Sequence, residues 1–123
     1  MSLTSLSPLD GRYASKVAPL CNHFSEQALI HARVMVEVLY FIALSKEGKI
    51  TDLPSVSAKQ TKALMKVVQN CDVAAAKKVK SIEKTTNHDV KAVEYYLKEQ
   101  VKKIPGLGKH AEFIHFGLTS EDV

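Results

Sequence analysis

The sequence has few cysteines and no closely spaced histidines. It contains only two cysteines, Cys21 and Cys71, and neither belongs to a CxxC pair. Its five histidines are scattered along the chain, and no HxxxH or HxH spacing occurs. Because metal sites are usually built from such closely spaced ligands, we expect no metal site.

Targeting and membrane segments are also lacking. Residues 1–8 do not show the basic and apolar regions of a signal peptide. No apolar run approaches the roughly 18 residues that a membrane span needs. We therefore expect a cytoplasmic protein without membrane contact, in a reducing compartment where both cysteines remain thiols.

Patterns typical of β-strands, internal repeats and low-complexity tracts are absent as well. Composition is that of an ordinary globular protein, with 46% hydrophobic and 24% charged residues. Apolar residues recur at gaps of three or four positions, which is the spacing of one helix face: Val90, Val93, Leu97, Val101 and Ile104. We predict an all-α fold.

The first long helix is predicted over residues 25–46, with Ser25 as its N-cap and Gly48 as its stop. Its apolar residues occupy more than one face, which indicates an oligomer or a further domain that covers it. Further helices are predicted after a capping box that starts at Ser57, over residues 73–84, after His88 and over residues 109–117. The last residues, TSEDV, are typical of a helix start, so we expect a truncated protein.

A polar cluster, residues 85–89 (TTNHD), directly precedes the apolar repeat that begins at Val90, so we predict that the cluster lies at the first turn of that helix. Backbone N–H groups at a helix start lack internal partners and carry the positive end of the helix dipole, so such a place binds anions. Asn87 and His88 are candidate donors to an anionic or amide-bearing ligand. A simple helix cap would explain the same residues. The net charge of +4 suits an anionic ligand without requiring nucleic acid.

Two other polar pairs are candidate ligand contacts. Arg12 and Tyr13 follow a turn and could bind a phosphate, although taken alone such a pair is more often an exposed Arg beside a half-buried Tyr. Thr119 and Ser120 could hold a carboxylate, or could only cap a helix. His115, close by, is interpreted as a core or interface histidine.

Taken together, three segments resemble the bacterial type of adenylosuccinate lyase, within the fumarase/aspartase superfamily. They are residues 7–13 (SPLDGRY), 85–94 (TTNHDVKAVE) and 115–122 (HFGLTSED), in the same order and spacing. The resemblance covers essentially the whole chain. It implies an N-terminal helical domain over residues 1–110 and the start of a central helical bundle over residues 111–123, the remainder of that bundle being absent.

The resemblance also implies a function. Members of this family eliminate fumarate from adenylosuccinate to give AMP, and cleave the analogous succinyl-carboxamide ribotide of purine biosynthesis. They are homotetramers, need no cofactor, and build each active site from three subunits. The substrate contacts expected here are Arg12, Tyr13, Asn87, His88, Asp89, Thr119 and Ser120. The catalytic serine base and histidine acid of the family would lie beyond Val123, so we expect this chain alone to be inactive.

A second hypothesis is a non-catalytic helical module that binds an anionic nucleotide or nucleic acid. Lys77, Lys80 and Lys84 fall on one helix face. Such a face is usually solvated, and no aromatic residues interleave with the lysines as they do on single-strand binding surfaces. The lyase hypothesis, by contrast, predicts a small-molecule substrate and no nucleic-acid partner.

Overall fold

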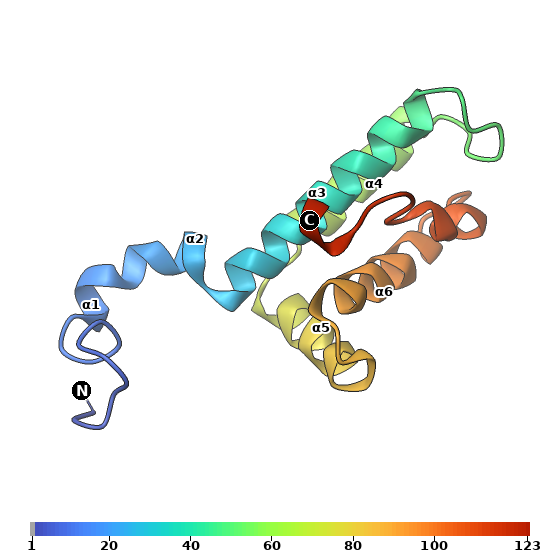
Figure 1. Ribbon diagram of the computed structural model, residues 1–123. Helices are drawn as coiled ribbons and strands as arrows, with labels where there is room; N and C mark the ends of the chain where they lie inside the picture. Colours follow the sequence, from blue (N-terminus) through green and yellow to red (C-terminus); the bar gives the residue numbers. More distant parts are fainter. Residues whose placement is uncertain (1) are drawn as a thin grey trace.

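The long helix α3 (Glu26–Lys46) is the element around which the others are arranged (Figure 1). In the computed structural model, which describes residues 2–123, it contacts α2, α4, α5 and α6. Ser25 is extended and its hydroxyl accepts the backbone N–H of Ala28 at 3.1 Å, so the predicted N-cap is confirmed. This cap fixes where α3 begins and where the chain turns into it.

The remaining elements are helical, and residues 2–123 contain no β-strand, which confirms the all-α prediction. Before α3 lie α1 (Ala14–Val17), the 3₁₀ turn η1 (Ala18–Leu20) and α2 (Cys21–Phe24). After it follow α4 (Ala58–Gln69), α5 (Val73–Thr86), α6 (Asp89–Lys102), and the 3₁₀ helices η2 (Gly108–Phe113) and η3 (Ser120–Asp122).

Local side-chain bonds set the starts of these helices. The predicted capping box of α4 is present: the Ser57 hydroxyl accepts the N–H of Gln60 at 3.2 Å, and the Gln60 side chain accepts the N–H of Ser57 at 2.9 Å. Residues 109–117, predicted as one short helix, instead form η2 and then a turn. The helix ends because Ile114 is extended and His115 has a positive φ of 63°.

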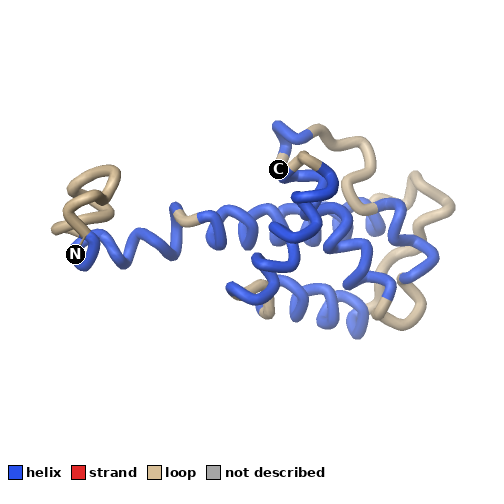
Figure 2. Tube along the Cα trace, turned by 90° about the horizontal axis from the view of Figure 1, so that it is seen from below, coloured by secondary structure: helices blue, strands red, loops and turns tan. Residues whose placement is uncertain are grey.

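The core lies between α3, α4, α5 and α6 (Figure 2). Apolar side chains at helical spacing meet there with almost no exposed surface: Val34, Val38, Phe41, Leu64, Val68, Val79, Val93, Leu97, Val101 and Ile114. Burial of each such side chain contributes roughly 1.5–3 kcal/mol of hydrophobic stabilisation. Ala111 and Ile114 belong to this same core; the boundary after residue 110 stays a prediction.

The opposite face of α3 remains apolar and exposed. Leu29, Met35, Val36 and Leu39 each keep more than a third of their surface in contact with solvent. Residues 2–25 extend from the bundle as an arm (Figures 1 and 2) and expose Leu6 and Phe24 almost completely. The prediction of a first long helix with apolar residues on more than one face is thus confirmed.

By length and composition, the stretch Ala14–Lys46 could cross a membrane. The sequence-based prediction that no segment approaches this length was wrong, because it considered only runs free of charge, and α3 is interrupted by few charged residues. Two of them, Arg33 and Glu37, face the bundle and have partners there. Core helices pass the same length and composition test, and α3 is the helix that α2, α4, α5 and α6 contact.

A buried carboxylate on α6 provides a test of this packing. Glu94 is 5% exposed and pairs with Lys91 and Lys98, each at 2.9 Å. Burial by itself raises the pKa of Glu94, but the hydrogen bonds from the two lysines outweigh it, and the net pKa is lowered. An acid whose pKa is lowered by folding stabilises the fold above its unfolded pKa, and this contribution is lost as the pH falls through the folded value.

We therefore expect Glu94→Gln to lower the free energy of unfolding by about 1.5–3 kcal/mol at pH 7. Urea unfolding of both proteins over a pH series should show that the difference in their free energy of unfolding shrinks as the pH falls below 4.5, the ordinary pKa of a glutamate. Glu99→Gln, at an exposed position of the same helix, is the matched control and should change the free energy by less than about 0.5 kcal/mol. A difference that does not vary with pH would contradict the assignment.

Candidate functional site

Three polar side chains form a stripe along the face of α3 that looks into the bundle: Arg33, Glu37 and Tyr40. Their spacing of four and three residues places them on one side of the helix, above one another. The side chain of Arg33 is 16% exposed and that of Glu37 is completely buried. Each of the three contacts a segment that the sequence marked as a candidate site. This polar stripe is therefore the scaffold on which the candidate site is built.

Arg33 holds the start of α6. Its Nη1 donates to Oδ2 of Asp89 at 2.7 Å, and Oδ1 of Asp89 accepts the N–H of Val90 at 2.9 Å. The hydrogen bond from Arg33 holds the pKa of Asp89 below its usual value. Asp89 is thus an anion at the positive end of α6, where it is stabilised by the helix dipole. Both of its oxygens are engaged within the protein.

The junction between α5 and α6 differs from the sequence prediction. Thr85 and Thr86 end α5 rather than opening α6, and Asn87 closes α5 in the left-handed region, with φ 51°. Its N–H donates to the carbonyl of Glu83 at 2.8 Å. Asn tolerates this conformation better than most residues. Asn87 is therefore a C-terminal cap of α5, and the prediction that it lies in the first turn of α6 was wrong.

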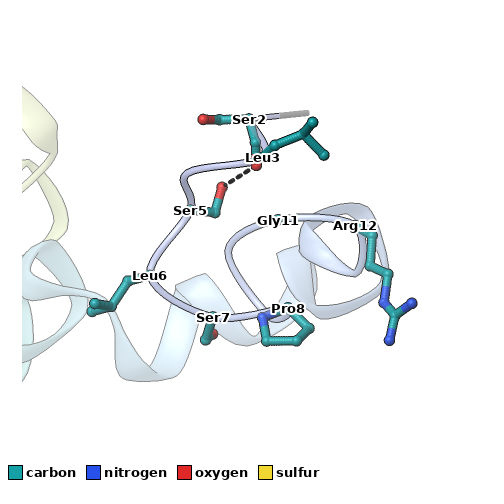
Figure 3. Close-up of a pocket in the computed structure, with 8 residues that line it drawn as sticks. All are labelled: Ser2, Leu3, Ser5, Leu6, Ser7, Pro8, Gly11 and Arg12. Carbon is teal, nitrogen blue, oxygen red and sulfur yellow. Dashed lines mark hydrogen bonds between the residues drawn. The ribbon is translucent and has the colours of Figure 1, made fainter.

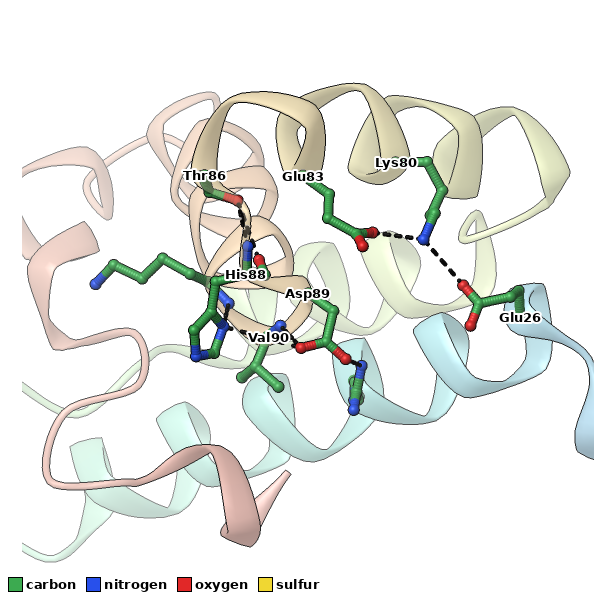
Figure 4. Close-up of polar contacts among 9 residues, drawn as sticks. Glu26, Lys80, Glu83, Thr86, His88, Asp89 and Val90 are labelled. Atoms are coloured by element: carbon green, nitrogen blue, oxygen red, sulfur yellow. Dashed lines mark hydrogen bonds and ion pairs between the residues drawn. The ribbon is translucent and has the colours of Figure 1, made fainter.

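His88 is the residue that caps α6. It is extended, and its Nδ1 accepts the N–H of Lys91 at 3.1 Å. The hydroxyl of Thr86 donates to the carbonyl of His88 at 3.0 Å, which fixes the backbone at the junction (Figure 4). An accepting Nδ1 carries no proton, so this hydrogen bond assigns the neutral ring the tautomer with its proton on Nε2. With a side chain 53% exposed, His88 offers one N–H donor to a ligand.

Glu37 and Tyr40 hold the second segment, residues 115–120. Nδ1 of His115 is hydrogen-bonded to Oε1 of Glu37, and the Tyr40 hydroxyl donates to the carbonyl of Phe116 at 2.8 Å. The backbone turns sharply here, because His115 and Gly117 both have positive φ, 63° and 75°. Sequence reasoning did not include His115 in the site. The available signal was Glu37, an acid within an apolar stretch of α3 that needs a partner.

Thr119 and Ser120 follow this turn and are exposed. Thr119 caps η3: its N–H and its hydroxyl donate to the Asp122 carboxylate at 2.8 and 3.1 Å. These bonds hold the pKa of Asp122 below its usual value. The predicted helix start at Thr119–Ser120 is thus confirmed. The polar stripe of α3 therefore carries both the His88–Asp89 pair and the segment that leads to Thr119 and Ser120.

Arg12 and Tyr13 are not brought to this place. They lie on the arm, at the far end of the molecule from α6 (Figure 1). The Arg12 guanidinium is 4.8 Å from the centre of the Tyr13 ring, a cation–π arrangement, and both side chains are exposed. The loop before them and Arg12 itself line an open surface hollow of about 400 Å³, and Figure 3 shows the Arg12 guanidinium extending out from that loop. Asp10 closes the loop by accepting the N–H of Ser7 at 2.7 Å.

The lysine face of α5 is partly neutralised. Lys80 pairs with Glu83 at 2.6 Å and with Glu26 of α3 at 3.2 Å (Figure 4). The hydrogen bond to Glu83, followed by that to Glu26, raises the pKa of Lys80. Lys77 and Lys84 are exposed on the same helix. Because its central lysine already has two acidic partners, this face is a poor candidate for binding a nucleic-acid backbone.

Comparison with known proteins identifies the family of this chain. A family model described as "Lyase" matches residues 11–123, and the chain belongs to this lyase family. Among its relatives are proteins named adenylosuccinate lyase: that of Haemophilus influenzae is 50% identical over 122 residues, that of Escherichia coli K12 48% over 122, and that of Dictyostelium discoideum 47% over 124. Each alignment covers 99% of this chain and 27% of the relative, so the chain spans about a quarter of their length.

Two substitutions of His88 separate its role as a helix cap from its role as a donor. His88→Ala removes the cap and should lower the free energy of unfolding by about 1 kcal/mol. Asn is among the best N-cap residues, so His88→Asn should stay within about 0.5 kcal/mol of the wild type. Chemical unfolding of the three proteins measures this. If both variants were equally stable, the cap assigned to Nδ1 would be wrong.

Proposed function

We propose that this chain supplies substrate contacts to an adenylosuccinate lyase, an enzyme that eliminates fumarate from adenylosuccinate to give AMP and from the succinyl-carboxamide ribotide of purine biosynthesis. The proposal rests on one observation. The polar stripe of α3 contacts both the His88–Asp89 pair and the segment that leads to Thr119 and Ser120, and each offers donors to an anion. Identity of 46–50% to four bacterial proteins with this name supports it. The proposal extends to a cytoplasmic enzyme that acts on small molecules rather than on nucleic acid or a membrane.

The chemistry of the substrate matches the groups available. It carries a phosphate and two carboxylates, and proton abstraction from the carbon beta to the leaving nitrogen places further negative charge on the carboxylate attached to that carbon. Fixed N–H and O–H donors stabilise such charge without reorganising. In this proposal the Nε2–H of His88 and the hydroxyls of Thr119 and Ser120 are such donors. The proton-transfer pair, a serine base and a histidine acid in this family, lies outside residues 1–123.

The contacts of Asn87 and Asp89 refine their proposed roles. Asp89 is an anion whose oxygens are occupied by Arg33 and Val90, so contact with an anionic substrate would be repulsive. We assign it to positioning His88. The backbone N–H of Asn87 donates to the carbonyl of Glu83 and so closes α5. The Asn87 side chain is exposed and can reach a ligand.

The proposal includes a homotetramer in which three subunits contribute to each site. Two observations support it. Arg12 and Tyr13 are exposed on an arm far from His88, as expected if they complete the site of another subunit. The exposed apolar face of α3 offers the kind of surface that subunit interfaces cover.

A direct test measures fumarate release from adenylosuccinate by the complete gene product that contains residues 1–123. We expect turnover, and we expect His88→Asn to lower kcat/KM by about 10- to 150-fold, the loss of one hydrogen bond to a charged group. Because Asn preserves the helix cap, this loss would not reflect unfolding. Lys77→Gln at the exposed lysine face is the matched control and should leave kcat/KM unchanged.

The 123-residue chain alone serves as a second control and should release no fumarate. A wild-type complete protein that releases none would refute the proposal. If Lys77→Gln weakened ligand binding with a steep salt dependence while His88→Asn did not, the nucleic-acid module would be the better account.

A further inference from the structure

Glu37 places a carboxylate in a fully buried, apolar part of α3. It has no exposed surface, and its neighbours Val34, Val38 and Phe41 are equally buried. Transferring an ionised carboxylate into such a place is strongly unfavourable unless it is paired and hydrogen-bonded. Burial accordingly raises the pKa of Glu37, although the His115 hydrogen bond opposes this effect. A methionine or leucine would fill the same volume without that penalty.

The partners of Glu37 show what the carboxylate does. Its Oε1 is bonded to Nδ1 of His115, and its Oε2 is buried with no hydrogen-bond partner among residues 2–123. The other charged group that acts on it is Glu94, which repels it. Asp122 is the further charge near His115. A buried ion pair is weak evidence for a stabilising role, because replacing it by apolar residues is often neutral. The bond to His115 therefore calls for another reason.

The backbone at His115 supplies that reason. A left-handed conformation in a residue other than glycine is unfavourable and persists only where its surroundings impose it. Two side chains of the polar stripe impose it here, Glu37 on the ring and Tyr40 on the next carbonyl. The turn leads directly to Thr119 and Ser120.

We propose that Glu37 is a positioning residue of the substrate site: through His115 it fixes the tautomer and orientation of the imidazole and the turn that delivers Thr119 and Ser120. An ionised Glu37 requires a proton on Nδ1 of His115, which leaves Nε2 as the nitrogen free to meet a ligand. The His115 side chain is 17% exposed, enough for contact on one edge. His88 presents a protonated Nε2 to a ligand, whereas His115 would present an Nε2 without a proton. The two histidines would thus have opposite tautomers. This inference rests on the proposed lyase function.

The test uses Glu37→Gln, which keeps the shape of the side chain and removes its charge. In the complete gene product kcat/KM for fumarate release should fall about 10- to 150-fold. The unfolding midpoint should stay close to that of the wild type, because glutamine fills the same volume and its side-chain oxygen can still accept the Nδ1–H of His115. The pH profile of kcat/KM should also be displaced, since a charge in direct contact with His115 has been removed. A purely structural role would move activity and stability together.

A double-mutant cycle decides whether Glu37 acts through His115. His115→Asn is the partner variant, because Asn tolerates a positive φ. On that background Glu37→Gln should cost less than about 2-fold further, since the two residues act as one unit. An independent loss of 10-fold or more would overturn the inference.

Nitrogen NMR of the 123-residue chain gives a readout that does not depend on activity. The neutral ring of His115 should carry its proton on Nδ1 in the wild type, and this preference should weaken in Glu37→Gln. A wild-type ring protonated on Nε2 would overturn the inference. No fumarate release by the wild-type complete protein would overturn the proposed function and this role with it, whereas an active wild type with an unaffected Glu37→Gln variant would overturn the role of Glu37 alone.

Discussion

The rest of the structure depends on one constraint: the charged side chains of α3 that lie inside the apolar bundle need partners. Arg33 and Glu37 lie one turn apart on a face that is otherwise packed with valine and phenylalanine. Unpaired, each would cost several kcal/mol. Their partners, Asp89 and His115, come from segments far along the chain. Satisfying the two charges therefore brings these segments to one helix face, and the candidate site is a consequence of that pairing.

The apolar core holds this arrangement in position. Val93, Leu97 and Val101 seat α6 against α3, and Ile114 seats the turn that carries His115. Positions on packed helices are held more precisely than positions on loops. The arm and the outer face of α3 have no comparable packing within the bundle. The molecule thus combines one ordered, inward-looking polar face with exposed apolar surfaces, an arrangement that is compatible with the proposed sharing of active sites between subunits.

Local features were predictable from the sequence, and long-range pairings were not. The caps at Ser25 and Ser57 and the start at Thr119 depend on side chains within three residues of the backbone groups they bind, so spacing alone reveals them. Asn87 was misassigned because asparagine suits both the start and the end of a helix, and only the fold decides between them. The bond between Glu37 and His115 joins residues 78 positions apart, and Lys80 pairs with Glu26 across helices. No periodicity records such contacts. The resemblance found the His88 and Thr119 segments, while the physical reason for their proximity, the polar stripe, emerged only in three dimensions.

Hydrogen exchange of the 123-residue chain tests most directly whether the polar stripe holds these segments in place. The amides of Phe116 and Leu118 are bonded only within short local turns, to the carbonyls of Phe113 and His115. Such turns protect amides only when something else fixes the segment. We expect clear protection in the wild type and a loss of about 10-fold or more in Tyr40→Phe, which removes the bond to the Phe116 carbonyl, with α6 unchanged. Exchange of both amides at the rate of an unstructured peptide in the wild type would contradict the account.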